Sequence, residues 1–299
     1  MALAYLFAVL AMLSIGVLGI LSKLADRLGC TPLNTTLVLF GGSAVFMGFY
    51  VGLIQRASLI PPAFVTGTAL AFGAIAVLAF WVFLFGLQFG KITSSWIFMN
   101  LSAVVPAALS TAIYHERVSA LKAIVLGFVI VAIVLLWKDK QHETDCASSP
   151  KAAKRSNVNI WITAMMAAFF LNGICPFGLR ILAGRGLAQH YTAVYLVYWY
   201  LAGFIFGLLG LIKQRKHFHG RNLAIGLVMA LASVGGQFFM GLALSKGAPG
   251  NVVYMLAMGA SICVVVFGGA VFFRERVGNC AKWGIGFGLV AAVLLGFTS

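Results

Sequence analysis

The chain has 299 residues, of which 62% are hydrophobic and only 9% are charged, and its formal net charge is +15. A soluble protein carries roughly a quarter charged residues, so this composition excludes an ordinary water-soluble domain. It indicates a membrane protein, because about 20 consecutive apolar residues make one spanning helix.

Ten apolar runs follow one another along the chain, separated by short polar breaks. They lack the ten-residue alternation of β-barrel strands, and a helix satisfies its own backbone groups inside lipid. The first run has no basic segment before it, so we expect it to be retained rather than cleaved as a signal peptide. The predicted spans are 2–22, 32–54, 64–87, 92–113, 119–137, 158–181, 190–212, 222–245, 250–273 and 279–298.

Most of the 21 Lys and Arg residues lie in the connections on one side of these spans, including the polar stretch 138–157. Basic residues concentrate in cytoplasmic loops, so we expect that stretch to be cytoplasmic and both termini to face outward. The expected location is a bacterial inner (plasma) membrane, with anionic lipid headgroups as partners. A nucleic-acid partner would need a basic face on a soluble domain, and we expect none.

The two halves of the sequence repeat each other. The interval from Glu116-Arg117 to Glu275-Arg276 equals the interval from Gly127 to Gly286. Each half holds five spans, and because five is odd the second half enters the membrane from the opposite side. The predicted fold is therefore all-α, with ten transmembrane helices arranged as two inverted repeats, a common plan for secondary transporters. The predicted units are 1–137, the linker 138–157, and 158–299.

These features resemble the drug/metabolite transporter superfamily, and more closely its ten-helix branch with two EamA domains. The resemblance is carried by the segment 100–106 with Glu116-Arg117, and by Ser261 with Glu275-Arg276, although Val265 stands where the first half has Pro106. It implies a cavity lined by spans 1–4 and 6–9, with spans 5 and 10 packing the halves together. Members move amino acids, other metabolites, sugars, sugar phosphates or cationic drugs.

One feature departs from the family pattern, and one is open to two interpretations. Bacterial members usually keep both termini in the cytoplasm, whereas the distribution of basic residues favours the opposite orientation. Gly284 and Gly288 form a pair with small-residue spacing that would let helices approach closely, although glycine is frequent here, at 34 residues.

Charged residues constrain the substrate. No Asp or Glu lies in the middle of a span, which argues against proton-coupled export of lipophilic cations. Lys23, Lys91, Arg180 and Lys246 lie near the ends of spans that the resemblance assigns to the cavity. They would either attract an anion or extend their charges to the membrane interface.

Polar and aromatic residues inside the spans are the main candidates for substrate contacts. Amides would be costly against lipid, so they line a cavity or bond neighbouring helices. The aromatic residues form either a stacking wall or an interfacial belt. Two prolines are candidate hinges or tolerated kinks. The candidates are Ser95, Trp96, Asn100, Asn172, Tyr195, Trp199, Gln237 and Tyr254, with Pro106 and Pro176 as hinges.

No catalytic constellation, metal site or cofactor is expected, because the five cysteines are scattered and no nucleophile, base and orienting group can be assembled. The sequence favours a secondary transporter of a small polar metabolite, such as an amino acid, by alternating access, acting as a monomer or homodimer. An organic-anion, sugar or sugar-phosphate exchanger, and a non-transporting scaffold or receptor, stay open as alternatives.

Overall fold

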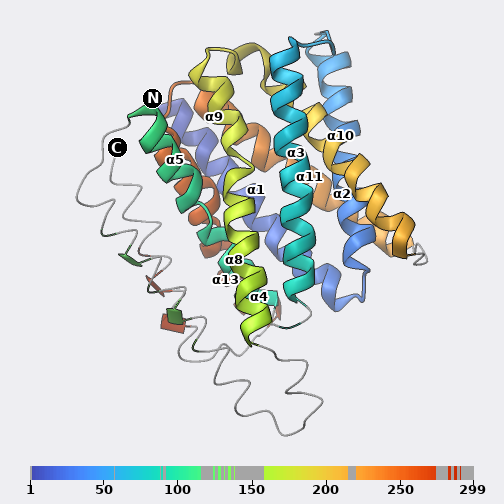
Figure 1. Cartoon of the computed structure of the whole chain (residues 1–299), viewed down its shortest axis with the longest axis vertical. Coiled ribbons are helices and arrows are strands. Elements are labelled where there is room, and N and C mark those ends of the chain that lie inside the picture. Colours follow the sequence, from blue (N-terminus) through green and yellow to red (C-terminus); the bar gives the residue numbers. More distant parts are fainter. Residues whose placement is uncertain are drawn as a thin grey trace, which may run out of the picture.

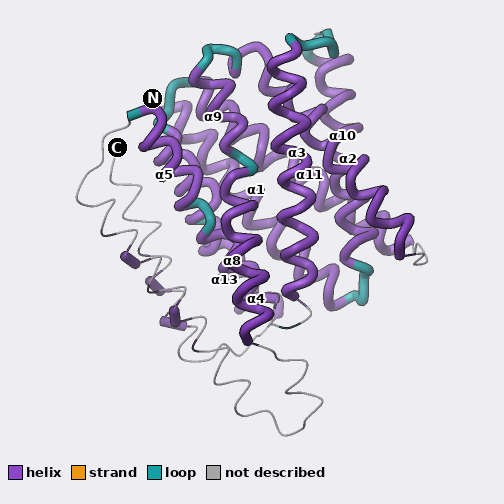
Figure 2. Tube along the Cα trace, viewed as in Figure 1, coloured by secondary structure: helices purple, strands orange, loops and turns teal. Residues whose placement is uncertain are grey.

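The computed structural model describes residues 2–56, 58–87, 89, 92–115, 158–214 and 220–273, with isolated residues between 124 and 138 and between 282 and 290. The described part is helical and contains no strand (Figures 1 and 2). Its elements are α1 (Ala2–Arg27), α2 (Pro32–Phe49), η1 (Tyr50–Ile54), α3 (Ala63–Leu87), α4 (Ile92–Leu101), α5 (Val104–Tyr114), α8 (Val158–Ile174), α9 (Phe177–Gly184), α10 (Ala188–Gln214), α11 (Gly220–Ser245), α12 (Gly250–Tyr254), η2 (Met255–Gly259) and α13 (Ser261–Phe273).

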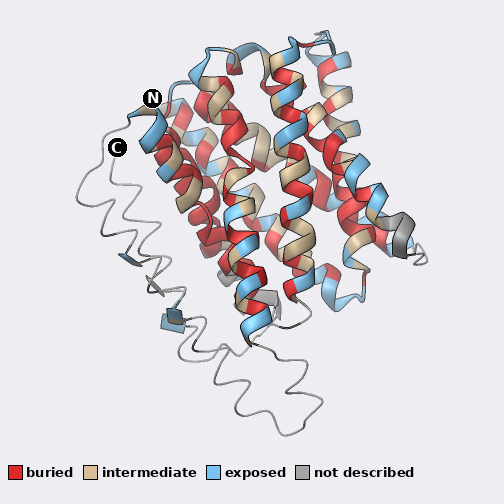
Figure 3. Cartoon of the chain, in the orientation of Figure 1, coloured by how far each residue is buried: buried red, intermediate tan, exposed pale blue. Residues whose placement is uncertain are grey.

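Six helical segments are long and apolar enough to cross a membrane: Leu3–Arg27, Pro32–Ile54, Ala63–Leu87, Val158–Gly184, Ala188–Gly210 and Gly220–Ser245. Exposed residues run along the outer faces of the helices (Figure 3). They include large apolar residues such as Phe49 at 61% and Phe267 at 71%. So extensive an apolar surface is unfavourable in water, and in a bilayer it faces lipid acyl chains.

Three segments predicted as continuous spans are interrupted instead. Span 92–113 divides into α4 and α5, and span 158–181 divides into α8 and α9. Pro106 lies in the first turn of α5 and Pro176 is the N-cap of α9, positions where a missing N–H is tolerated. Span 250–273 contains no proline, yet it passes from α12 through the π-helix η2 to α13.

The long helices pack crosswise between the two halves of the sequence. Helix α1 lies against α11, α8 lies against α3, and α2 lies beside α10. Glycines bring the backbones together: Gly173 faces Val105 and the carbonyl of Ser102, and a Cβ at Gly173 would lie 2.8 Å from that oxygen. Gly16 likewise faces Val264. These close contacts place the interrupted helices next to one another in the interior.

Candidate functional site

A small cavity of about 90 Å³ lies in the interior, where the interrupted helices meet. A water needs about 10–15 Å³ of such space, so the cavity can hold several waters. None of the described residues that line it is charged. They come from α1, α2, α3, α4, α8, α10, α11 and η2, and are Ile15, Leu18, Leu39, Phe40, Ala76, Phe80, Trp96, Met99, Asn100, Asn172, Cys175, Pro176, Trp199, Ser233, Gln237 and Met258.

Two asparagines fix the polar side of the cavity. Asn172 on α8 donates from Nδ2 to the hydroxyl of Ser102 at 2.8 Å and to the carbonyl of Met99 at 3.2 Å. Asn100 on α4 donates to the carbonyl of Trp96 at 3.0 Å, and its Oδ1 accepts a 2.8 Å bond from the Ser261 hydroxyl. The amides therefore connect the breaks α4/α5, α8/α9 and η2/α13, and set their side chains at the cavity wall.

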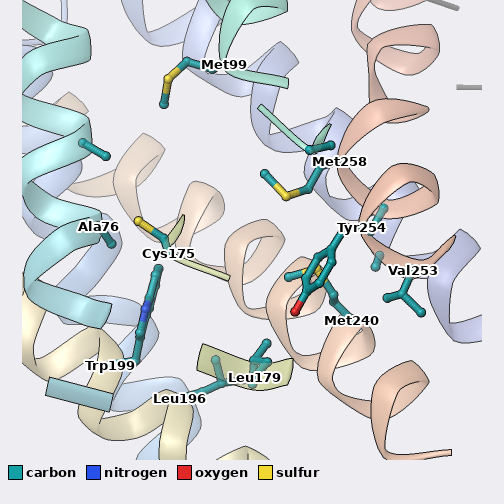
Figure 4. Packing of buried hydrophobic residues seen from close by; sticks show 14 of the residues in the cluster. Ala76, Met99, Cys175, Leu179, Leu196, Trp199, Met240, Val253, Tyr254 and Met258 are labelled. Carbon is teal, nitrogen blue, oxygen red and sulfur yellow. The ribbon is translucent and has the colours of Figure 1, made fainter. Parts of the chain in front are cut away.

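Aromatic rings form another part of the wall. The ring centroid of Trp199 lies 5.7 Å from that of Phe40, which lies 5.8 Å from that of Phe80. Figure 4 shows Trp199 beside Cys175 and Ala76. The indole Nε1 of Trp96 is buried and has no hydrogen-bond partner among the described residues. An unpaired buried donor is costly to the fold, and this one lies against Gly19 on α1, where a Cβ would come within 2.4 Å of it.

The structure brings six of the predicted site residues together around this cavity: Trp96, Asn100, Asn172, Pro176, Trp199 and Gln237. Three other candidates are buried elsewhere. The Ser95 hydroxyl accepts from the indole of Trp161 at 3.0 Å, and the Tyr254 hydroxyl donates to the carbonyl of Pro176 at 3.0 Å. Tyr195 is 1% exposed, and its hydroxyl has no partner in the described part of the chain.

The basic candidates do not converge on one cavity. Thr31, just after α1, bonds Asn222 at the start of α11, so Lys23 near the end of α1 lies toward that end of the bundle. Lys246 follows the other end of α11, whose 26 residues span about 39 Å at 1.5 Å per residue. Arg180 lines a hollow with Ser245 and Gly247 and therefore shares the end with Lys246. Lys91 lies outside the described residues.

The structure describes only some of the other predicted residues. Pro106 is buried in the first turn of α5 and does not line the cavity. Gly284, Gly288 and the linker residues after Lys138 lie outside the described residues. Within the described part of the chain, no group of three His, Cys, Asp or Glu side chains could hold a metal ion.

Sequence reasoning missed several residues of the wall. Phe40, Phe80, Met99 and Met258 have no sequence feature that separates them from the many other apolar residues in the spans. Ser233 also escaped notice, although it lies four residues before Gln237 and so shares its helix face. The four-residue spacing from Gln237 is the one sequence feature that could have identified Ser233.

The chain is similar to known proteins in both sequence and fold. Residues 2–138 match the EamA-like transporter family, which confirms the resemblance to the drug/metabolite transporter superfamily. Members of this family are transporters, and with the six long apolar helices the match identifies an integral, multi-pass membrane protein. No curated protein matches the chain. A solved structure described only as "Crystal structure of protein" aligns over 96% of both chains, with a TM-score of 0.63 and 15% identity, and this similarity shows the fold alone.

Proposed function

We propose that this chain, whose residues 2–138 belong to the EamA-like transporter family, is a secondary transporter of a small, polar, uncharged or zwitterionic metabolite. An amino acid or a related compound is the first candidate. The observation that carries the proposal is the uncharged interior cavity, to which helices of both halves contribute amide and indole groups. A binding site needs a few such polar groups converging within apolar walls.

The proposed mechanism is alternating access between two inverted five-helix repeats, 1–137 and 158–299, joined by the linker 138–157. Crosswise contacts support it. Gly16 and Gly173 are equivalent in the repeat, and so are Val264 and Val105, and each glycine packs against the valine of the opposite half. Helix α1 lies against α11 just as its equivalent α8 lies against α3, the equivalent of α11. In the proposed ten-helix fold, spans 119–137 and 279–298 complete the repeats.

The chemistry of the wall favours a substrate without net charge. Amide side chains both donate and accept, and indoles donate, so the cavity can match the two ends of a zwitterion. A bare anion or cation would find no opposite charge on the wall. At about 90 Å³ the cavity is smaller than a typical ligand pocket, so the proposed cycle has the halves separate to admit the substrate.

An organic-anion or sugar-phosphate exchanger ranks second, because Lys23 and Arg180 lie toward the two ends of the bundle rather than on the cavity wall. A non-transporting scaffold or receptor ranks third, since it has no need of a polar cavity enclosed between the two halves.

We place the protein in a bacterial inner membrane as a monomer or homodimer, with the linker on the cytoplasmic side, as the basic residues favour.

Counterflow in liposomes tests the proposal. Liposomes that contain the full-length protein are loaded with one unlabelled compound from a panel of amino acids and sugar phosphates, and uptake of the same labelled compound is measured. We expect accumulation for a subset of the panel, and a reduction of at least tenfold in Asn100→Ala. The matched control, Thr68→Ala, removes a hydroxyl that bonds only within its own helix. Flux of sugar phosphates alone would favour the second candidate, and no flux for any compound would favour the scaffold.

A further inference from the structure

A layer of buried side chains separates the interior cavity from the end of the bundle that holds the turns α9–α10 and α11–α12. Four chain segments each place one residue on the cavity wall and another in this layer, three or four positions nearer to that end. The wall residues are Pro176, Trp199, Gln237 and Met258, and the layer residues are Leu179, Tyr195, Met240 and Tyr254. Each layer residue is 2% exposed or less, so packed side chains fill the space beyond the cavity on this side (Figure 4).

Three short helices, α5, α9 and α12, lie together at this end. Contacts join α5 to both α9 and α12, and the ring centroids of Tyr114 on α5 and Phe177 on α9 lie 6.3 Å apart. Each of the three begins or ends at one of the helix interruptions beside the cavity. An interruption can absorb a change of backbone dihedral angles at a few residues, so a short segment can move there while the longer segment stays packed.

The Tyr254 hydroxyl holds the layer together. It donates to the carbonyl of Pro176 at 3.0 Å, and so it joins α12 to the break between α8 and α9. The same carbonyl accepts the backbone N–H of Leu179 at 3.1 Å, a bond within its own segment. If α12 moves away from α9, only the bond from Tyr254 is lost. This bond therefore stabilises the closed layer and not an open one.

Tyr195 has the opposite effect on the layer. Its hydroxyl is buried against Gly178 on α9 and has no hydrogen-bond partner in the described part of the chain. An unpaired buried hydroxyl costs free energy, whereas in an open layer water or a polar group of the substrate can bond it. The cost is present only while the layer is closed, so this hydroxyl favours opening.

We propose that this layer is the gate through which the substrate enters or leaves the interior cavity, with Tyr254 as its latch and Tyr195 as the residue that favours opening. The inference rests on the proposed transport function, and it adds the side on which the path opens and the residues that control it. Helix α5 belongs to the first half, and α9 and α12 belong to the second. Separation of the halves at this end therefore takes α5 away from the two helices that carry Leu179 and Tyr254.

Labelling of a thiol in the layer tests the gate without a transport assay. In the full-length chain with its native cysteines replaced, Met240→Cys places one thiol in the layer, and a methanethiosulfonate reagent is added to the purified protein in detergent. Labelling should be roughly fivefold faster with Tyr254→Phe, which removes the latch, and roughly fivefold slower with Tyr195→Phe, which removes the unpaired hydroxyl. If Met240→Cys does not fold, Leu179→Cys gives the same comparison.

Two controls separate opening of the gate from a general loosening of the fold. Tyr200→Phe removes another buried hydroxyl of α10, which bonds Ser233 at 2.9 Å outside the layer, and it should leave the labelling rate of the layer thiol unchanged. A chain that keeps only Cys30, near the end of α1, should label at one rate in all three tyrosine variants.

Thermal unfolding measures the pairing of the hydroxyls independently. Tyr195→Phe should raise the unfolding midpoint by roughly 2–4 °C, because it removes a buried group without a bond. Tyr254→Phe and Tyr200→Phe should each lower the midpoint by a similar amount, because each loses a hydrogen bond. A fall of the midpoint in Tyr195→Phe would show that its hydroxyl is paired, and would overturn its role.

Equal labelling of the layer thiol in wild type, Tyr195→Phe and Tyr254→Phe would also overturn the gate. Counterflow in liposomes then separates this inference from the proposed function. If a compound accumulates while the labelling rates do not differ, the substrate takes another path and the gate alone fails. If the labelling rates change as expected and no compound accumulates, the layer opens as proposed and the transport function is what fails.

Discussion

Asn172 on α8 donates a hydrogen bond of 2.8 Å to the hydroxyl of Ser102, at the break between α4 and α5. The same hydroxyl is hydrogen-bonded to the carbonyl of Met99. The hydroxyl of Ser261, its equivalent in the repeat, shares its single hydrogen between the carbonyl of Met258 and Oδ1 of Asn100. Each serine hydroxyl thus bonds a carbonyl beside a helix break, and the Met99 carbonyl also accepts from the backbone N–H of Ser102 and from Asn172. Asn172 then ties one of these breaks to the opposite half.

Asn172→Ala should uncouple the two halves at this point. Interhelical hydrogen bonds in membrane proteins contribute about 0.6 kcal/mol on average and at most about 1.7 kcal/mol, so we expect the unfolding midpoint in detergent to fall by only a few degrees. Transport should fall more severely, by tenfold or more, because the amide also lines the cavity. Flux equal to wild type in Asn172→Ala would contradict a role for this amide at the substrate.

Comparing Trp96 with Trp161 measures how much an indole N–H hydrogen bond contributes to stability. The Trp161 indole bonds Ser95 at 3.0 Å, whereas the Trp96 indole has no partner among the described residues. Both changes to Phe remove similar volume, but only Trp161→Phe loses a bond, so it should be less stable by about 1 kcal/mol than Trp96→Phe. Unfolding in detergent measures the difference, and equal loss in both variants would show that the Trp96 donor is satisfied.

The glycine–valine contacts give a test of the crosswise packing. Gly173→Ala should destabilise by about 1–3 kcal/mol, because its Cβ would meet Val105 and the Ser102 carbonyl. Val105→Ala in the same chain should restore part of that loss, and Gly16→Ala with Val264→Ala should behave alike. Gly67→Ala is the control, since nothing lies within 4 Å of its Cβ position. Independent, additive effects of Gly173→Ala and Val105→Ala would argue against this contact.

Hydropathy was sufficient to place the long helices, because a bilayer-spanning run is defined by length and apolarity. It could not reveal the breaks at Ser102 and Ala260, since a helix break changes backbone bonding without changing composition. Residue type also identified Asn172 and Gln237 as cavity residues, because amide side chains are costly in lipid. It did not distinguish Trp199, on the cavity wall, from Tyr195, which is buried elsewhere, because the direction of a side chain depends on tertiary packing.

Cys175 offers a direct test of whether the interior cavity opens. Its thiol lies on the cavity wall and is 5% exposed, and it bonds the carbonyl of Leu171 at 3.0 Å. Because the thiol is buried, its reaction with a methanethiosulfonate reagent should be faster in a conformation in which the halves separate. We expect slow labelling in a variant whose other cysteines are replaced, and faster labelling when a transported substrate drives the cycle.

The control is the chain that keeps only Cys30, a buried cysteine near the end of α1 that does not line the cavity. Its labelling rate should not respond to substrate, because alternating access changes exposure at the cavity rather than throughout the bundle. Labelling should also abolish flux in the Cys175 chain and leave it intact in the Cys30 chain. If Cys175 reacts at the same rate with and without every compound that the liposomes accumulate, the cavity is not on the transport path, and the substrate crosses elsewhere between the halves.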